Sequence, residues 1–523
     1  MQLTLEFLDI SEFEPKRIEA SWSNPRLSPT LKRERDAVAQ RLIGIQTDNE
    51  LANLLEIPVG QLLHILYEEK KRYHEFYIKK KSGQLRVIES PNKSLKILQH
   101  KVKPLIEYHY RVKKSCHGFV GNGKGIVSNA EKHKKKQYVL NIDLKDFFHS
   151  VHFGRVRGIF MNVPFNMGNS AASVLAQLCT NHSRLPQGAP TSPVLSNLAA
   201  SSLDTALTKI AKRYHLTYTR YADDITFSSN RKFPLAIVDR FETDLGKVEW
   251  RVGSLLRQSI EESGFTVNDS KTRVQHRSQR QEVTGLVVND GVNVSRKFIR
   301  NTRAMLNSWS KDLVEAERRF LMTRYHMSES EIDSKKLDGR YFKNAIYGRL
   351  SFIKMIRGED NSSYLTLCKK ILELEPSPPK SIAKLKERFE MYDVFVCHAS
   401  EDKDDVAIPL HRALEDKGIK AFIDCFEIKW GDSLVAKINT ALQKSKYVVA
   451  IISQHSVNKA WPMKELNAVL SSEIDSKQTK LLPLIVGDQN ALIEELPLLA
   501  DKLFKVFDDD IDQIASELEM RLK

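Results

Sequence analysis

A short proline-rich segment divides this chain into two parts that differ in pattern and in charge. Residues 373–380 read ELEPSPPK, and such closely spaced prolines end any helix because proline lacks an amide hydrogen and clashes with the preceding turn. Residues 391–523 hold 16 Lys and Arg against 23 Asp and Glu, a net charge of −7, whereas the whole chain carries +15. Residues 1–390 therefore carry +22. We predict domains with different partners on either side of a linker at residues 373–390.

The basic part of the chain has the charge of a protein that binds nucleic acid. An excess of +22 in one part of the chain favours phosphate binding over a merely solubilising surface, which needs no such concentration of one sign. The cysteines are scattered without a CxxC pair, so we expect free thiols in a reducing compartment, with neither disulfides nor a zinc site. These residues are Cys116, Cys179, Cys368, Cys397 and Cys425.

Hydropathy predicts a cytoplasmic protein with no membrane partner. The first residues, MQLTLEFLDISEFEPKR, lack the basic end and apolar core of a secretory signal. No apolar run in the sequence is long enough to cross a bilayer.

The pattern of apolar residues changes along the chain and predicts several domains. Residues 1–80 look helical and amphipathic, residues 81–295 mix short strands with helices, and residues 296–372 return to helix. After residue 391 the apolar runs YDVFVCHAS, KAFID, KYVVAIIS and KLLPLIV alternate with helical stretches. This alternation predicts a parallel sheet covered by helices on both faces, with ligands at the carboxyl ends of its strands.

Three segments of the basic part carry acidic and glycine-bearing patterns typical of nucleotidyl transfer. YVLNIDLKDFFHS (138–150) predicts a strand ending near Asp143, LPQGAPTSPVLSNLAA (185–200) a loop that opens a helix, and TYTRYADDITFSS (217–229) a hairpin with Asp223 and Asp224 at its turn. Nucleotidyl transfer uses two divalent ions about 4 Å apart, and Mg²⁺ prefers carboxylate oxygens. These aspartates are our candidate catalytic residues and ligands of two Mg²⁺ ions. Adjacent residues of a strand point to opposite faces, so Asp223 and Asp224 need not contribute equally. We expect Asp143 and Asp223 to be the principal metal ligands.

An isolated Asp-Asp pair is usually just a polar turn, but here strand-forming residues flank it. With the other two segments, YADD resembles the catalytic hairpin of reverse transcriptases. The resemblance implies a right-hand α+β fold with fingers and palm over residues 81–295, a helical thumb over residues 296–372, and deoxynucleoside triphosphates as substrates. It also implies that Phe148 excludes a ribose 2′-hydroxyl, that Gln187 and Gly188 lie beside the incoming base pair, and that Arg86 contacts phosphate.

Two further elements resemble those of retron reverse transcriptases. Residues 129–133 match their NAxxH element and residues 283–285 their VTG element, and CHGFVGNGKG (116–125) is similar to a retron pattern. The glycines of the last segment are not a phosphate-binding P-loop, because no GK[ST] follows. The retron resemblance implies a cognate structured non-coding RNA, priming from an RNA 2′-hydroxyl, and a satellite msDNA product. An untemplated polymerase is the rival interpretation, and the retron elements argue against it.

Residues 391–523 resemble a Toll/interleukin-receptor (TIR) domain, which implies a flavodoxin-like α/β fold. YDVFVCHASEDK (392–403), FIDCFEIKWGDSL (422–434) and SQHSVNKAWPMKEL (453–466) carry the resemblance. It places Glu465 at the catalytic position of TIR domains that hydrolyse NAD⁺, on one helical face with Trp461. A carboxylate there would stabilise the ribose cation. Ser400 and Phe426 would contact the ligand.

The TIR resemblance leaves other readings open. Glu465 could be an ordinary solvated helix residue, and Phe426 and Pro462 stand where many members of the family have Trp and Cys. The domain could be a non-catalytic assembly module that forms homo-oligomers, or it could make a cyclic ADP-ribose signal instead of hydrolysing NAD⁺. We favour a defence enzyme in which an RNA–DNA complex holds the TIR domain inactive until phage infection.

Overall fold

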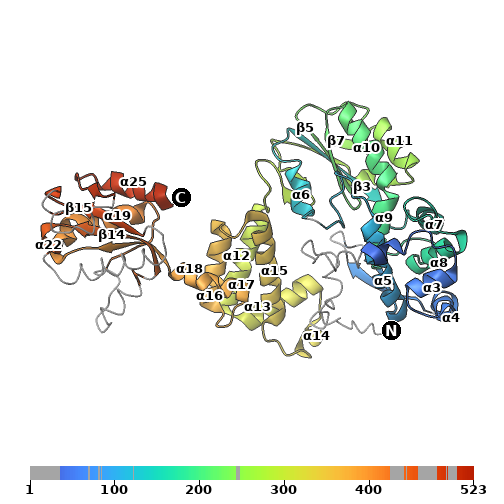
Figure 1. The fold of residues 1–523 in the computed structure, drawn as a ribbon, viewed down its shortest axis with the longest axis horizontal. Coiled ribbons are helices and arrows are strands. Elements are labelled where there is room, and N and C mark those ends of the chain that lie inside the picture. The colour runs from blue at the N-terminus through green and yellow to red at the C-terminus, as the bar shows by residue number, and fades with distance from the viewer. Residues whose placement is uncertain are drawn as a thin grey trace. The chain divides into compact units, whose positions relative to one another are not determined.

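The computed structural model describes most of the chain, and its internal packing divides it into two compact units. The described residues are 36–68, 71–79, 83, 85–121, 123–242, 248–423, 441–442, 444–457, 480–489, 492 and 503–522. The first unit comprises Met1–Met305 and Arg340–Tyr364, and the second comprises Leu306–Gly339 and Leu365–Lys523 (Figure 1). Among the described residues, no helix is both long and apolar enough to span a membrane.

The first unit begins with short helices followed by a β-hairpin. Helices α3 (Asp48–Leu54), α4 (Val59–Leu63) and η2 (His64–Glu68) precede strands β1 (Tyr73–Lys79) and β2 (Leu85–Pro91), and α5 (Lys93–His109) follows. The strands pair antiparallel along their full length. The helical expectation for residues 1–80 is therefore wrong at residues 73–79. That segment, YHEFYIK, is rich in aromatic residues, which favour a paired strand.

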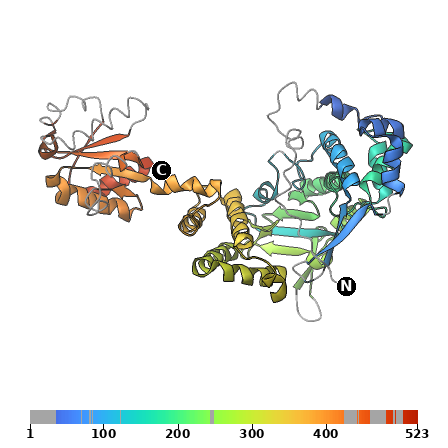
Figure 2. The same cartoon turned by 90° about the horizontal axis from the view of Figure 1, so that it is seen from below.

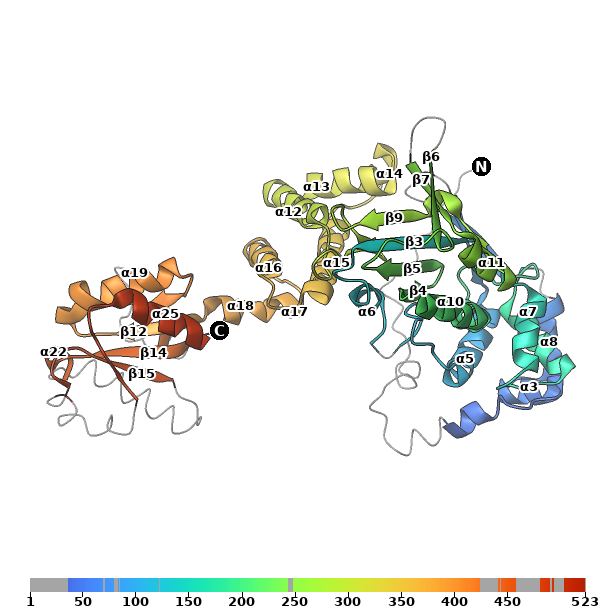
Figure 3. The ribbon, with the colours of Figure 1, turned by 90° about the horizontal axis from the view of Figure 1, so that it is seen from above.

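An antiparallel sheet forms the centre of the first unit. Its strands are β3 (Tyr138–Lys145), β4 (Thr217–Tyr221), β5 (Asp224–Ser229), β8 (Thr266–Val267) and β9 (Arg273–His276). Their order is β4-β5-β3-β8, with β9 also paired to β3 (Figure 3). Consecutive residues of β3 and β5 are buried, so both faces of the sheet are covered there. The sheet therefore lies inside the unit, and its strand ends can hold side chains rigidly.

Helices cover this sheet. They are α6 (Ile126–Glu131), α7 (Phe153–Met161), α8 (Asn169–Cys179), α9 (Ser192–Ala199), α10 (Ser201–Arg213) and α11 (Ser254–Glu262). Helix α10 contacts β4 and α11, while α6 contacts β4 and the small hairpin of β10 (Glu282–Val283) and β11 (Leu286–Val287). A second small hairpin joins β6 (Val238–Glu242) to β7 (Val248–Val252).

Residues 296–390 are mainly helical, as the sequence predicts. The helices are α12 (Arg296–Lys311), α13 (Leu313–Phe320), η4 (Leu321–Tyr325), α14 (Glu329–Asp333), α15 (Arg340–Arg357), α16 (Ser362–Leu374), α17 (Lys380–Ala383) and α18 (Leu385–Glu390). Helix α16 ends just before the prolines, and α17 begins directly after Pro379. The proline run thus interrupts the helices as expected, although the domain boundaries drawn around it stay a prediction.

The C-terminal part contains the predicted parallel sheet. Strands β12 (Tyr392–Cys397), β13 (Ala421–Phe422), β14 (Ser445–Ile452), β15 (Leu481–Ile485) and β16 (Lys505–Val506) have the order β13-β12-β14-β15-β16, with every pair parallel. This order is flavodoxin-like. Short segments η5 (Ser400–Asp402), η6 (Lys403–Ala407) and α22 (Gln454–Val457) follow the ends of strands β12 and β14. The α/β prediction is confirmed.

Both faces of the parallel sheet are buried. Helices α19 (Ile408–Asp416) and α25 (Ile511–Leu522) pack on one face of the sheet (Figure 2). There Val394 and Val396 of β12 share a buried apolar cluster with Leu410 and Leu518. The intervening residue Phe395 points to the other face and packs with a separate apolar cluster. This alternation along β12 is what a strand buried on both sides requires.

Candidate active site

Three carboxylates meet where β3 and the β4–β5 hairpin end. Asp143 lies near the end of β3 and is directly opposite Asp224, the first residue of β5, in the antiparallel register. Asp223 occupies the turn after Ala222, whose φ of 55° allows the tight reversal. The carbonyl of Asp223 accepts a hydrogen bond of 3.1 Å from the amide of Leu144 on β3. The structure therefore brings together the three aspartates that the sequence selects.

Burial and mutual repulsion disfavour the charged forms of two of these carboxylates. Burial, together with repulsion from Asp223 and Asp143, raises the pKa of Asp224 to about 6. Burial also raises the pKa of Asp223, with a further contribution from the charge of Asp143. Lys271 places its Nζ 3.0 Å from both carboxylate oxygens of Asp143, and Asn268 donates to the same carboxylate over 3.0 Å. The carboxylate of Asp143 thus binds a cation in this structure, the ammonium group of Lys271.

The residues expected at the nucleotide come from β2 and the loop before α9. The amide of Glu89 on β2 donates to the carbonyl of Gln187 over 2.9 Å. Gly188 has a φ of 137°, and a Cβ added there would lie 2.8 Å from the carbonyl oxygen of Glu89. Arg86 on β2 is exposed, and its charge lowers the pKa of Asp223 against the larger effect of burial. Glycine is therefore required where this loop meets β2.

An aromatic cluster lies beside the same carboxylates. Phe148, the expected sugar-excluding residue, is partly buried, with its ring centroid 5.9 Å from that of Phe119. Phe119 in turn lies 6.4 Å from Tyr221, the last residue of β4. The exposed part of Phe119 extends the aromatic surface that Phe148 begins.

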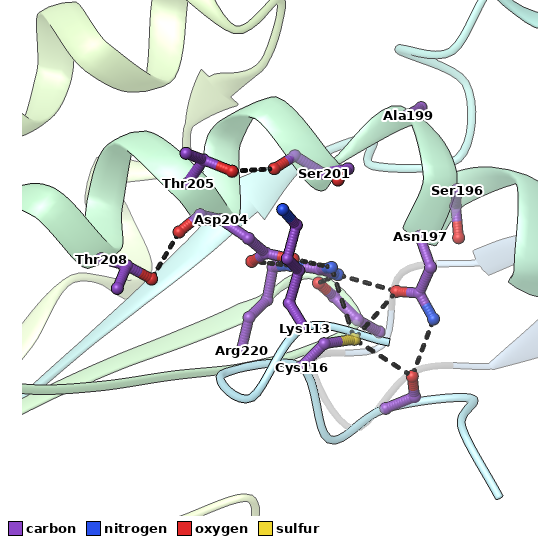
Figure 4. Close-up of polar contacts among 12 residues, drawn as sticks. Lys113, Cys116, Ser196, Asn197, Ala199, Ser201, Asp204, Thr205, Thr208 and Arg220 are labelled. Carbon is purple, nitrogen blue, oxygen red and sulfur yellow. Dashed lines mark hydrogen bonds and ion pairs between the residues drawn. The ribbon is translucent and has the colours of Figure 1, made fainter. Parts of the chain in front are cut away.

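A fully buried ion pair supports the hairpin from behind (Figure 4). Arg220 of β4 is 0% exposed and Asp204 of α10 is 1% exposed. The guanidinium binds both oxygens of Asp204, through Nε at 2.8 Å and Nη2 at 2.7 Å. Its remaining hydrogens reach Asn197 Oδ1 at 3.0 Å, the Ala222 carbonyl at 3.1 Å and Cys116 Sγ at 3.5 Å. All five guanidinium hydrogens therefore have acceptors.

The loop before α6 packs directly on the aspartate turn. Its backbone forms a parallel bridge to β4, with the His117 amide donating to the Arg220 carbonyl over 2.9 Å. A Cβ added to Gly118 would lie 2.5 Å from the amide nitrogen of Ala222. Asn197 donates to the Gly118 carbonyl over 2.9 Å and so ties this loop to the buried network. The CHGF segment is therefore a backbone support for the turn.

The NAxxH element braces the same hairpin on its far side. His133 is fully buried, and its two ring nitrogens lie 2.7 Å from Ser228 Oγ of β5 and 2.7 Å from Thr219 Oγ1 of β4. Burial lowers the pKa of His133 to about 3, so the ring is neutral and pairs with two hydroxyls that can each donate or accept. Ala130 of this element packs with Val283 of the VTG element in one small core.

Residues 78–289 match the family described as reverse transcriptase (RNA-dependent DNA polymerase), and residues 394–518 match the TIR domain family. The retron Ec86 reverse transcriptase of Escherichia coli is 32% identical over 273 residues, which cover 51% of this chain and 80% of that protein. This chain belongs to the retron reverse transcriptases. The retron Mx65 reverse transcriptase of Myxococcus xanthus is 37% identical over 299 residues, 53% of this chain and 66% of that protein. The chain thus spans just under two thirds of that relative's length.

The C-terminal part of this retron reverse transcriptase has relatives of its own. The probable 2′ cyclic ADP-D-ribose synthase TcpB of Brucella abortus is 38% identical over 136 residues, covering 25% of this chain and 53% of that protein. The NAD(+) hydrolase TcpA of a Theionarchaea archaeon is 33% identical over 128 residues, covering 24% of this chain and 39% of that protein.

The TIR site of the retron enzyme is described only in part. Ser400 begins η5 at the carboxyl end of β12 and is exposed there. Nearby, the buried Asp402 accepts a 2.6 Å hydrogen bond from Ser453 at the end of β14, so these two strand ends are joined. Phe426, Trp461 and Glu465 lie outside the described residues.

Sequence reasoning missed several residues of the retron polymerase site. Lys271 and Asn268 lie more than 40 positions after Asp224, and no motif marks them. Phe119 stands in a glycine-rich segment that reads as a loop. Arg220 carried a usable signal, because a charged residue in a buried strand needs an opposite charge; the partner, Asp204 on α10, is visible only in three dimensions.

We expect the Arg220–Asp204 pair to govern the stability of the first unit. Arg220→Met should lower its free energy of unfolding by about 3–5 kcal/mol, because the carboxylate of Asp204 would remain buried without a partner. The double variant Arg220→Met/Asp204→Leu should recover much of that loss, since no charge stays buried. Arg213→Met, on the exposed end of α10, is the matched control. Denaturant unfolding measures all three, and equal stability of Arg220→Met and Arg213→Met would contradict the assignment.

Proposed function

We propose that the first part of this chain is an RNA-directed DNA polymerase that copies a cognate structured RNA into satellite msDNA. The observation that carries the proposal is the register of Asp143 opposite Asp224, with Asp223 in the adjoining turn. Membership of the retron family supports the RNA template and the DNA product. The net charge of +22 on residues 1–390 supports binding of both nucleic acids.

Asp143 and Asp223 are the residues that would hold Mg²⁺, with Asp224 beside them. Within the part of the chain that the structure describes, no three or more His, Cys, Asp or Glu side chains are arranged as a metal cluster. The carboxylates still suit the ion, because Mg²⁺ completes its shell with waters and substrate phosphates. The raised pKa values of Asp223 and Asp224 and the ammonium of Lys271 beside Asp143 support a site that attracts positive charge. When bound, two such ions supply activation of the attacking hydroxyl and charge neutralisation at the leaving phosphate.

The surrounding residues would position the nucleotide. Arg86, exposed on β2, would bind the triphosphate. Gln187 and Gly188 present backbone against β2 and would form the floor under the new base pair. Phe148, supported by Phe119, would contact the sugar at the position of a 2′-hydroxyl and so favour deoxynucleotides.

For the C-terminal part we propose cleavage of the nicotinamide–ribose bond of NAD⁺, with Glu465 facing the ribose. The named activities of TcpA and TcpB, hydrolysis and cyclisation, support NAD⁺ chemistry of this class. TcpB favours the alternative in which the product is a cyclic ADP-ribose; a pure assembly module is the remaining alternative. In the proposed system, the polymerase and its msDNA hold this activity in check until phage infection releases it.

Replacing both Asp223 and Asp224 with Ala should abolish msDNA synthesis while the protein stays folded. The change removes two of the three carboxylates at the strand ends, and repulsion between them is relieved, so the melting temperature should not fall. Gel analysis of DNA extracted from expressing cells measures the product. Undiminished msDNA in this variant would refute the polymerase assignment.

The close approach of Gly118 to the aspartate turn provides a second test. Gly118→Ala should lower DNA synthesis on a supplied primer–template at least tenfold, because the added methyl group collides with the backbone of Ala222 and displaces Asp223. Gly121→Ala is the matched control in the same loop, since a Cβ there meets no atom within 4 Å. Equal loss in both variants would show that loop flexibility, and not the contact with the turn, matters.

Glu465→Gln should stop NAD⁺ loss during phage infection and remove protection. Gln keeps the size of the side chain and removes its charge, and loss of one electrostatic stabiliser typically lowers a rate by about 10²–10³-fold. Glu415→Gln, an exposed change on α19, is the control. NAD⁺ and ADP-ribose products are measured by mass spectrometry of infected cells. Full protection by Glu465→Gln would favour the assembly module.

A further inference from the structure

A cavity of about 860 Å³ lies in the first unit outside the carboxylate site. Four segments line it: residues 113–117, the region of α6, helix α10 and the start of β4. None of Asp143, Asp223 and Asp224 is among its lining residues. The role proposed for the polymerase does not use this cavity.

The cavity wall is strongly basic. Its lysines are Lys113, Lys114, Lys124, Lys132, Lys209 and Lys212, and its one acidic residue is Asp204. Both oxygens of Asp204 are engaged by Arg220, so that charge is already neutralised. A wall of this composition attracts an anion with several negative charges.

One lysine of the wall forms hydrogen bonds within the protein, whereas others are exposed and can bind a ligand. Lys124 donates to the carbonyls of Lys113, Lys114 and Cys116, at 2.9, 3.3 and 2.8 Å, and so folds the loop. Lys132, Lys209 and Lys212 are exposed, and among the described residues no ion pair engages them. Lys209 and Lys212 are three positions apart on α10 and thus share one side of the helix.

Two elements that support the catalytic hairpin also meet at this cavity. CHGFVGNGKG contributes His117 and Lys124, and the NAxxH helix contributes Ser128 and Lys132. His117 is 3% exposed and its Nδ1 lies 2.8 Å from Ser128 Oγ, which joins the two elements. Because burial lowers the pKa of His117 to about 4, the ring is neutral near pH 7 and the positive charge of the wall comes from lysines.

The size of the cavity selects the class of ligand. About 860 Å³ exceeds what a single phosphate fills and lies in the range of cavities that hold small organic molecules. A paired A-form helix presents a broad convex surface that cannot enter it, whereas an unpaired strand can insert nucleotides. Hydroxyls of Ser115, Thr205 and Thr217 on the wall add partners for ribose and base.

We propose that this cavity binds an unpaired segment of RNA, with its phosphates on Lys132, Lys209 and Lys212. The proposal rests on the proposed function, in which RNA is the partner. It adds a second binding site, outside the primer–template cleft, for an unpaired segment of that RNA. Its wall shares Asp204 with the network around Arg220 (Figure 4), and Tyr218 of the same wall donates to Asp204. Bound RNA would therefore contact the two elements, α10 and β4, that hold the catalytic hairpin.

The test uses the full chain and a fluorescein-labelled, unstructured 20-nucleotide RNA of mixed sequence. Affinity is measured by anisotropy over a series of salt concentrations for wild type, Lys209→Ala, Lys212→Ala and the double variant. Each lost phosphate contact should reduce the slope of log affinity against log salt by about 0.7. In the double variant this slope should therefore fall by about twice that amount, and the melting temperature should stay unchanged.

Arg213→Ala is the matched control, because Arg213 follows Lys212 on α10, loses the same charge and does not line the cavity. It should keep the wild-type slope. An unchanged slope in the double variant, or an equal change in Arg213→Ala, would overturn the proposal. So would an equal loss with a blunt RNA duplex, or a larger loss with the same strand as DNA.

Photocrosslinking with 4-thiouridine in the same RNA gives an independent readout. Crosslinked peptides should include residues 205–219, and their absence would overturn the proposal. DNA synthesis by the wild type on a supplied primer–template is measured in parallel. Absence of that synthesis refutes the polymerase, whereas unchanged slopes in an active polymerase refute only the cavity.

Discussion

The buried pair of Arg220 and Asp204 is the interaction on which the polymerase site depends. Removing two charges from water costs several kcal/mol for each ion, and only complete hydrogen bonding offsets that cost. Here every guanidinium hydrogen has an acceptor, and those acceptors come from the aspartate turn, α9, α10 and the loop at Cys116. A displacement of any one of these segments would leave a buried polar group without a partner, so the pair fixes them in a single arrangement.

The elements that distinguish retron enzymes act on the same hairpin from other sides. His133 joins β4 to β5 through two hydroxyls, and Gly118 lets a loop backbone lie against the aspartate turn. The VTG element reaches the hairpin indirectly, by packing Val283 against Ala130. These features make the retron elements structural supports of the catalytic turn, whichever nucleic acids they also contact.

Much of this architecture could be predicted from local pattern. The YADD hairpin, the strand ending near Asp143 and the parallel sheet after residue 391 each have a periodicity or turn signal that depends on neighbours in sequence. The β1 strand at residues 73–79 could not be separated from a helix, because YHEFYIK becomes a strand through its pairing with β2. Lys271 and Asp204 were missed for a related reason: their roles come from contacts across 128 and 16 positions, and local sequence does not record such distances.

The first unit is not one continuous stretch of chain, since it takes Arg340–Tyr364 from beyond the start of the second. The first unit is therefore still incomplete when residue 305 has left the ribosome. That unit can close only when α15 has emerged, and Leu306–Gly339 must wait longer, because the rest of the second unit begins at Leu365. The first TIR strand, β12, is synthesised later still. Because domains fold in the order in which they are made, the first unit of each new molecule is complete before its TIR domain is.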